Sequence, residues 1–141
     1  MRRVMFALVL SIVAMLPAFA DVRILSSPGG AVSDYLKFFS HVRQSGKRVV
    51  IDGPCLSACT LVLSTIPRNR ICVTPRAILG FHAPLVVDYQ TGRIFRSSVI
   101  TRAVAASYPA GVRTWIKRNG GLNQKLIFLR GRQLAALYAR C

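Results

Sequence analysis

Short β-prone runs alternate with helical segments in the first part of the chain, and this alternation restricts the possible folds more than any other feature. Runs rich in Val and Ile end at turns that contain Gly or Pro. Between positions 32 and 42, apolar residues recur at three- and four-residue steps, as on the buried face of a helix. The expected strands are 22–25, 48–52, 70–74 and 77–82, and the expected helices are 31–44 and 58–66. Strands and helices in turn indicate an α/β fold, with a mostly parallel sheet and flanking helices.

The second half of the chain shows helical periodicity but no catalytic pattern. Residues 88–92 are expected to form a loop before a helix at 94–107, whose apolar face carries Val99, Ile100, Ala103 and Val104. A second helix follows Pro109 and ends at 119–121. A strand at 126–129 and a final helix at 132–140 complete the expected elements.

The first twenty residues have the pattern of an export signal. Arg2 and Arg3 precede an apolar stretch at 4–16, and Ala18-Phe19-Ala20 has the small-x-small form that signal peptidase cleaves. The chain has 141 residues, so cleavage after Ala20 leaves 121 residues, which fit one domain at 21–141. An uncleaved membrane anchor is the alternative, but the apolar stretch is short for a bilayer span. We therefore expect a soluble, periplasmic or secreted protein.

The chain is strongly basic, with a formal net charge of +16 and no Glu. Without Arg2 and Arg3, 18 of the 20 Lys and Arg residues remain against four Asp residues, which gives +14. Such a charge attracts polyanions, so the expected partners are an anionic envelope surface or an acidic polymer. The basic residues are scattered and do not form a tract with interleaved aromatic residues, which argues against a dedicated nucleic-acid site.

The four cysteines form an even set in a chain that is expected to be exported, so we predict disulfides. They are Cys55, Cys59, Cys72 and Cys141, and the sequence leaves all three pairings open. A zinc site is the alternative, but only Cys55 and Cys59 are closely spaced and no His follows them at finger-like spacing. We therefore predict neither a metal site nor a cofactor.

Two turns that lead from a strand into a helix carry residues of chemical interest. In the first, Ser27-Pro28-Gly29-Gly30, consecutive glycines allow backbone N–H groups to face an anion or an oxyanion. The second, 53–59, places Ser57 at a helix start, where the helix dipole favours developing negative charge. The alternatives are an ordinary Pro-Gly turn and a serine that only caps the helix.

His82 follows Ser57 by 25 residues and ends an expected strand. The carboxyl ends of strands in an α/β sheet face the crevice in which ligands usually bind. His82 is therefore a candidate partner for Ser57, and the alternative is a histidine satisfied at the edge of the sheet.

Three segments, taken together and in order, resemble the signature blocks of the Clp-protease and crotonase-like superfamily. They are residues 27–30, residues 53–59 around Ser57, and Ile78-Leu79-Gly80-Phe81-His82-Ala83-Pro84. The chain looks closest to exported, Clp-like bacterial proteins whose serine motif is flanked by cysteines. The resemblance covers residues 22–84 and implies a Clp-protease-like α/β domain. Members usually have a further strand-helix unit before the first turn. The resemblance therefore implies either a minimal variant, truncated at the N-terminus, or a longer protein in which the apparent signal is partly a strand and a helix.

The resemblance implies roles for five residues. Ser57 would be the nucleophile and His82 the general base, while the backbone N–H of Gly29, or of Gly30 next to it, would form an oxyanion hole with that of Ala58. This constellation implies hydrolysis of an amide or an ester through an acyl-enzyme.

Clp-like peptidases generally take a third, acidic member from well after the histidine, and no residue matches that position here. The only acid after His82 is Asp88, six residues on. We expect either Asp88 or a backbone carbonyl to orient the imidazole, because loss of the orienting group lowers the rate by orders of magnitude.

Two functions of different classes fit these residues. The first is an extracytoplasmic, ATP-independent serine hydrolase that acts on peptides or, less readily, on esters. The second is a non-catalytic basic binding module that has the same fold and holds an anionic partner. The Ser57–His82 pair and the glycine turn favour the first, whereas the missing acid and the short N-terminal part favour the second. The sequence leaves the oligomeric state open, a homo-oligomer included.

Overall fold

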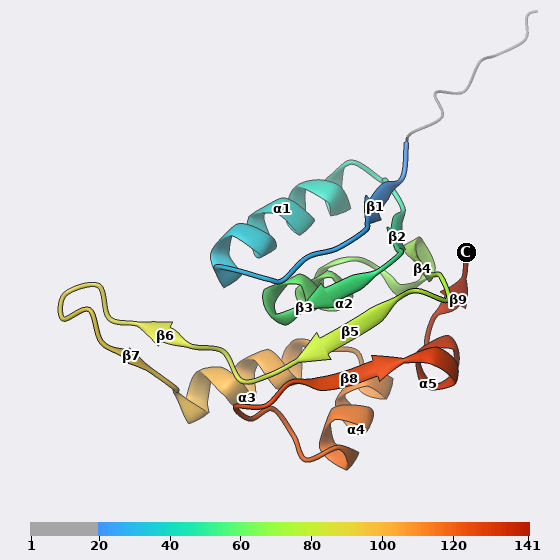
Figure 1. The fold of residues 1–141 in the computed structure, drawn as a ribbon. Helices are drawn as coiled ribbons and strands as arrows, with labels where there is room; N and C mark the ends of the chain where they lie inside the picture. The colour runs from blue at the N-terminus through green and yellow to red at the C-terminus, as the bar shows by residue number, and fades with distance from the viewer. Residues whose placement is uncertain (1–19) are drawn as a thin grey trace, which may run out of the picture.

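The computed structural model describes residues 20–141, whose strands form two main sheets (Figure 1). The larger sheet has the strand order β1-β2-β4-β9 and is parallel throughout. Its strands are β1 (Val22–Ile24), β2 (Val49–Ile51), β4 (Ile71–Val73) and β9 (Ala139–Arg140). Every residue of β2 and β4 is buried, as is typical of central parallel strands. The prediction of an α/β class with a parallel sheet and flanking helices is confirmed.

The second sheet contains a strand that the sequence analysis does not predict. Its order is β3-β5-β8, with β3 (Pro54–Leu56) parallel to β5 (Ile78–Phe81) and β8 (Ile127–Arg130) antiparallel to β5. The strand expected to end before Gly53-Pro54 does end there, as β2, but the chain then enters β3 in the second sheet. A Cβ atom at Gly53 would lie 1.9 Å from the carbonyl oxygen of Leu25, so glycine is needed where the chain passes this point.

Helices lie on both sides of the strands (Figure 1). On one side, α1 (Val32–Gln44) packs against the 3₁₀ helix η1 (Ser57–Leu61) and against α2 (Val62–Thr65). On the other side lie α3 (Ser98–Ser107) and α4 (Ala110–Arg118). The short η2 (Arg68–Arg70) precedes β4, and α5 (Gly131–Ala135) follows β8. The core contains the fully buried side chains of Phe39 from α1, Leu79 and Phe81 from β5, and Leu129 from β8.

Two predicted helices have wrong boundaries. The helix expected at 94–107 begins at Ser98, because Ile94 and Phe95 form strand β7 and pair with β6 (Val86–Val87). The Ser97 hydroxyl then caps α3 by accepting a hydrogen bond from the Ile100 N–H at 3.3 Å. The expected loop at 88–92 is the tip of this hairpin. The helix expected at 132–140 ends at Ala135, and residues 139–140 form β9 beside β4.

The prediction that the four cysteines form disulfides is confirmed, and the structure selects one of the three possible pairings. Cys55 pairs with Cys59, and Cys72 pairs with Cys141, with Cα–Cα distances of 5.3 and 5.0 Å. The second bridge ties the end of the chain to β4, which explains why the last residues form a strand and not a helical turn. Two disulfides are compatible with an extracytoplasmic location.

A buried carboxylate joins three parts of the larger sheet. Asp52 follows β2 and is almost fully buried. It accepts hydrogen bonds from Arg76, from the Thr74 hydroxyl at 2.7 Å and from Arg23 at 2.7 Å. These hydrogen bonds, with that of Arg76 the largest contribution, hold the pKa of Asp52 well below its usual value. The carboxylate is thus fully used in holding β1, β2 and the turn after β4 together.

No helix within residues 20–141 is long and apolar enough to cross a membrane. The predicted export signal, 1–20, lies outside the described residues except for Ala20.

Candidate active site

Ser57 lies on a sharp bend between β3 and η1. Leu56 before it is extended, with φ −112° and ψ 153°, and Ser57 itself has a φ of +54°. No other non-glycine residue in the described part of the chain has a positive φ. For an L-residue such a conformation is unfavourable by roughly 1–2 kcal/mol, and it persists only where the surrounding structure holds the residue in place. A strained bend of this kind is typical of a nucleophile elbow.

His82 reaches Ser57 from the end of β5. The distance from His82 Nε2 to Ser57 Oγ is 2.8 Å, and the distance from His82 Nδ1 to the carbonyl oxygen of Ala83 is 2.7 Å. Because a carbonyl oxygen can only accept, Nδ1 carries the proton and donates it to Ala83. Nε2 of the neutral imidazole is then free to accept the Ser57 hydroxyl proton. The geometry therefore selects the tautomer that a general base needs.

Asp88 does not contact His82. Its carboxylate accepts hydrogen bonds from the backbone N–H groups of Gln90 and Thr91, at 2.9 and 3.2 Å, in the turn of the hairpin. Hydrogen bonding by the Thr91 side chain and by these two amides lowers the pKa of Asp88. Two groups were expected to orient His82, Asp88 or a backbone carbonyl. In the structure the backbone carbonyl lies at the imidazole, whereas Asp88 is bound in the hairpin turn.

Ala83, whose carbonyl orients His82, is bound through its N–H to a distant loop. The Ala83 N–H donates a hydrogen bond to the carbonyl oxygen of Asn123 at 2.8 Å. This contact fixes the peptide that follows His82, although nothing in the sequence marks Asn123 as part of the site.

The glycine turn packs directly against the serine bend. Gly29 has a φ of +89°, and a Cβ atom built on it would lie 2.6 Å from Ser57 Cβ and 3.1 Å from the Ala58 nitrogen. The Gly29 N–H donates a hydrogen bond to Ser27 Oγ at 3.4 Å, whereas the Ala58 N–H belongs to the first turn of η1, where no intrahelical acceptor is available. Gly29 and Ala58 thus lie beside Ser57, whereas the atom nearest to a Cβ built on Gly30 belongs to Tyr35.

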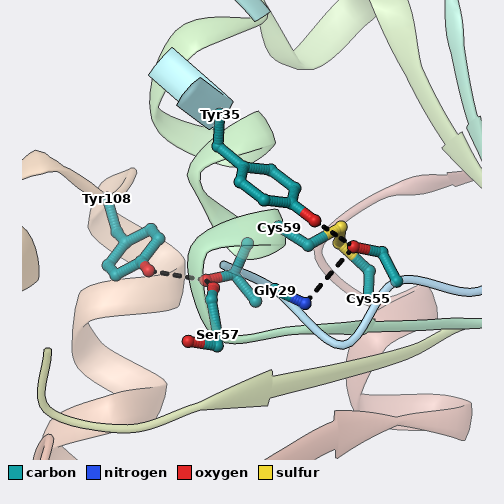
Figure 2. Close-up of a disulfide and its surroundings, with 8 residues drawn as sticks. Gly29, Tyr35, Cys55, Ser57, Cys59 and Tyr108 are labelled. Carbon is teal, nitrogen blue, oxygen red and sulfur yellow. Dashed lines mark hydrogen bonds between the residues drawn. A yellow bond between two sulfur atoms is a disulfide. The ribbon is translucent and has the colours of Figure 1, made fainter. Parts of the chain in front are cut away.

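Hydroxyl groups of Thr60, Tyr108 and Tyr35 also hold the bend and the glycine turn, and the sequence analysis did not identify these three as part of the site. The Thr60 hydroxyl donates to the Ser57 carbonyl oxygen at 2.7 Å, so the Tyr108 hydroxyl must donate to Thr60 Oγ1 at 2.6 Å (Figure 2). Burial raises the pKa of Tyr108 to about 12, against an opposing contribution from the Thr60 hydrogen bond. On the other side, Ser27 Oγ and Tyr35 Oη share a hydrogen bond of 2.6 Å. No local signal could identify Tyr108, because its partner Thr60 lies 48 residues earlier in the sequence.

The Cys55–Cys59 disulfide spans the bend. Ser57 lies between the two bridged residues in the sequence, and Figure 2 shows it to one side of the bridge, while the Tyr35 ring reaches toward the bridge from above. Both cysteines are fully buried. The bridge closes a loop with a sequence separation of only 4, so it restricts the backbone on both sides of Ser57.

No group of three or more His, Cys, Asp or Glu residues that could hold a metal ion exists within residues 20–141. No protein-family model matches the chain, and no curated protein is significantly similar to it. What the arrangement can do follows from its parts: an activated hydroxyl, an imidazole in the basic tautomer and adjacent amides can perform acyl transfer.

Proposed function

We propose that this protein is an extracytoplasmic serine hydrolase, peptidase-like and independent of ATP. The observation that carries the proposal is the 2.8 Å contact between Ser57 Oγ and His82 Nε2, with Nδ1 committed to the Ala83 carbonyl. A serine that merely capped a helix would need neither a positive φ nor a histidine partner.

The proposed reaction uses only groups of the site. His82 Nε2 takes the hydroxyl proton while Ser57 Oγ attacks the carbonyl carbon of the substrate. The oxyanion that forms is stabilised by the N–H of Ala58 and of Gly29 or Gly30. His82 then returns the proton to the leaving amine or alcohol as the intermediate collapses to an acyl-enzyme. Water, activated in the same way, releases the acid and restores Ser57.

The orienting carbonyl of Ala83 suggests a slow enzyme. A carboxylate beside Nδ1 would stabilise the imidazolium that forms during the reaction, whereas a neutral carbonyl oxygen does so less strongly. We therefore expect turnover below that of triads with an acid, by up to several orders of magnitude. The proposal concerns a Ser-His dyad, not a complete triad.

The finer fold assignment is part of the same proposal. We assign the domain to the Clp-protease and crotonase-like superfamily on the order of its three motifs. Support comes from the parallel β1-β2-β4-β9 sheet and from the parallel pairing of β3 with β5, since these strands lead into the serine bend and into His82. The two disulfides support the extracytoplasmic location.

A non-catalytic binding module remains the second candidate, favoured by one observation. Asp88, the only acid after His82, is engaged in the hairpin turn, so the imidazole lacks a charged partner. On this hypothesis the strongly basic chain holds an anionic partner, and the serine has no covalent reactivity.

Labelling with a fluorophosphonate probe separates the two candidates. The disulfide-intact protein should be labelled at neutral pH, whereas Ser57→Ala should not be, and His82→Ala should react at least about a thousandfold more slowly. Ser64→Ala is the matched control, because Ser64 lies on α2 and bonds only to Ser107. An unlabelled wild type, or labelling that survives in Ser57→Ala, would remove the hydrolase proposal.

A further inference from the structure

The β6–β7 hairpin and the first turn of α3 expose many large apolar side chains. Six of them define what we call the hairpin patch: Leu85, Tyr89, Ile94, Phe95, Val99 and Ile100. Tyr89 at the tip is 93% exposed, and Ile94 and Val99 are each 65% exposed. Concentrations of exposed apolar side chains of this kind usually mark an interaction surface.

The chain itself does not cover the hairpin patch. Within residues 20–141, β6 and β7 pair only with each other, and Figure 1 shows the hairpin extending away from the body of the molecule. The sequence predicts a buried apolar face on α3, yet this helix has no buried residue. An isolated two-stranded hairpin is only marginally stable in water, so the hairpin patch needs another environment.

Basic residues surround the hairpin patch. Arg93, Arg96 and Arg102 are exposed on the hairpin and on α3. The only acid in this region is Asp88, and the amides of Gln90 and Thr91 occupy its carboxylate. Apolar and aromatic side chains next to arginines are characteristic of segments that enter the interface of an anionic membrane.

We propose that the hairpin patch docks into the interfacial layer of an anionic lipid bilayer. Charge decides between this partner and a second copy of the chain. A second copy would bring the same three arginines into contact with their equivalents, in a chain that already carries +16. Anionic headgroups offer the opposite charge together with an apolar layer for the side chains. This inference goes beyond the proposed hydrolase activity and does not depend on it.

Docking would bring the candidate active site to the membrane surface. Only Ala83 and Pro84 separate His82 from Leu85, the first residue of the hairpin patch. The Ser57–His82 pair would then face substrates held at the bilayer.

Cosedimentation with lipid vesicles tests the apolar part of the proposal. The vesicles contain phosphatidylcholine with or without phosphatidylglycerol. The test variant, Ile94→Ser/Ile100→Ser, removes two patch side chains that are 65% and 40% exposed. The control, Leu25→Ser/Leu36→Ser, removes two equally large side chains outside the hairpin patch, which are 61% and 40% exposed. We expect binding to phosphatidylglycerol vesicles to fall about tenfold or more in the first variant and to stay unchanged in the control.

Two further measurements test charge and depth. Arg93→Gln/Arg96→Gln should weaken binding to phosphatidylglycerol vesicles by about tenfold or more, since each basic residue near an anionic leaflet contributes about a factor of five. The control Arg118→Gln/Arg132→Gln, which removes exposed arginines from α4 and α5, should change it much less. In Tyr89→Trp, the tryptophan emission should shift to the blue when these vesicles are added.

Three results would overturn the proposal. If the hairpin variants and their controls bind equally, the attraction is diffuse electrostatics without docking. If the wild type does not bind phosphatidylglycerol vesicles, the protein has no membrane-binding surface. If the wild type forms a dimer that Ile94→Ser/Ile100→Ser dissociates, and vesicles do not compete with it, the hairpin patch binds a second copy of the chain.

Discussion

The substitution Gly29→Ala tests whether the glycine turn positions the nucleophile. Gly29 has a φ of +89°, and an added Cβ would lie 2.6 Å from Ser57 Cβ and 2.7 Å from the Leu56 carbonyl oxygen. Both neighbours are at the serine bend, and the carbonyl belongs to the backbone, so no flexible side chain can move aside. The methyl group therefore has to displace the bend or the turn.

The size of the effect follows from two contributions. A positive φ disfavours alanine by about 1–2 kcal/mol at any position. Ordinary contact begins near 3.4 Å, so Ser57 Cβ at 2.6 Å must move by about 0.8 Å relative to Gly29. Since a displacement of about 1 Å at a reacting group lowers the rate about a hundredfold, we expect labelling by a fluorophosphonate to slow between about tenfold and a hundredfold.

Gly46→Ala is the matched control for this experiment. Gly46 also has a positive φ, +74°, but no atom lies within 4 Å of its added Cβ. Both variants should lose similar stability from the backbone conformation, and only Gly29→Ala should also lose labelling. Thermal unfolding and labelling rates measured on the same samples separate the two effects. If Gly29→Ala is labelled as fast as Gly46→Ala, the glycine turn does not position Ser57 and the reasoning is refuted.

The disulfides and the buried tyrosine give the remaining predictions. Replacing Cys72 and Cys141 with alanine should lower the free energy of unfolding by about 4 kcal/mol, because that bridge spans a sequence separation of 69, and equal stability in urea denaturation would contradict this. Replacing Cys55 and Cys59 should cost only about 2 kcal/mol over a separation of 4, yet it should slow fluorophosphonate labelling far more than the first pair does. The pKa of Tyr108 is raised to about 12, so the unfolded chain loses its proton first and up to about 2–3 kcal/mol of stability disappears as the pH rises from 10 to 12. Circular dichroism should show a shallower loss over this pH range in Tyr108→Phe, and identical profiles would argue against the raised pKa.

Local patterns predicted the elements whose burial is regular over a few residues, either on one face of a helix or at every residue of a central strand. The periodic apolar residues of α1 and the continuous Val-Val-Ile of β2 are such cases, since each pattern is complete within a few residues. The sequence does not predict strands β3 and β9, because their partner strands are distant in the sequence. Strand β9, for example, pairs with β4 and is held there by the Cys72–Cys141 bridge. The sequence predicts a loop and a helix in place of the hairpin because β6 and β7 have two residues each, too few to show alternation.

The residues of the candidate site also include some that the sequence predicts and some that it does not. Ser57, His82 and the two glycines stand at turns that the sequence marks with Gly, Pro and small residues, so their proximity could be predicted from the order of the motifs. Asn123, which holds the Ala83 peptide, has no such mark. Its role depends on the return of the chain to this region just before β8, which only the tertiary structure specifies.

Three separate contacts support the serine bend, two from the β3–η1 segment and one from the glycine turn. A left-handed serine is held only if its surroundings outweigh the strain. Here the Cys55–Cys59 bridge restrains the bend along the chain, Thr60 holds the Ser57 carbonyl, and Gly29 packs against its Cβ. Because each support is small compared with the stability of a domain, loss of one should leave the fold intact. It should still move the hydroxyl relative to the imidazole, and acyl transfer is sensitive to displacements of less than an ångström. Activity should therefore be lost well before structure when these supports are removed one at a time.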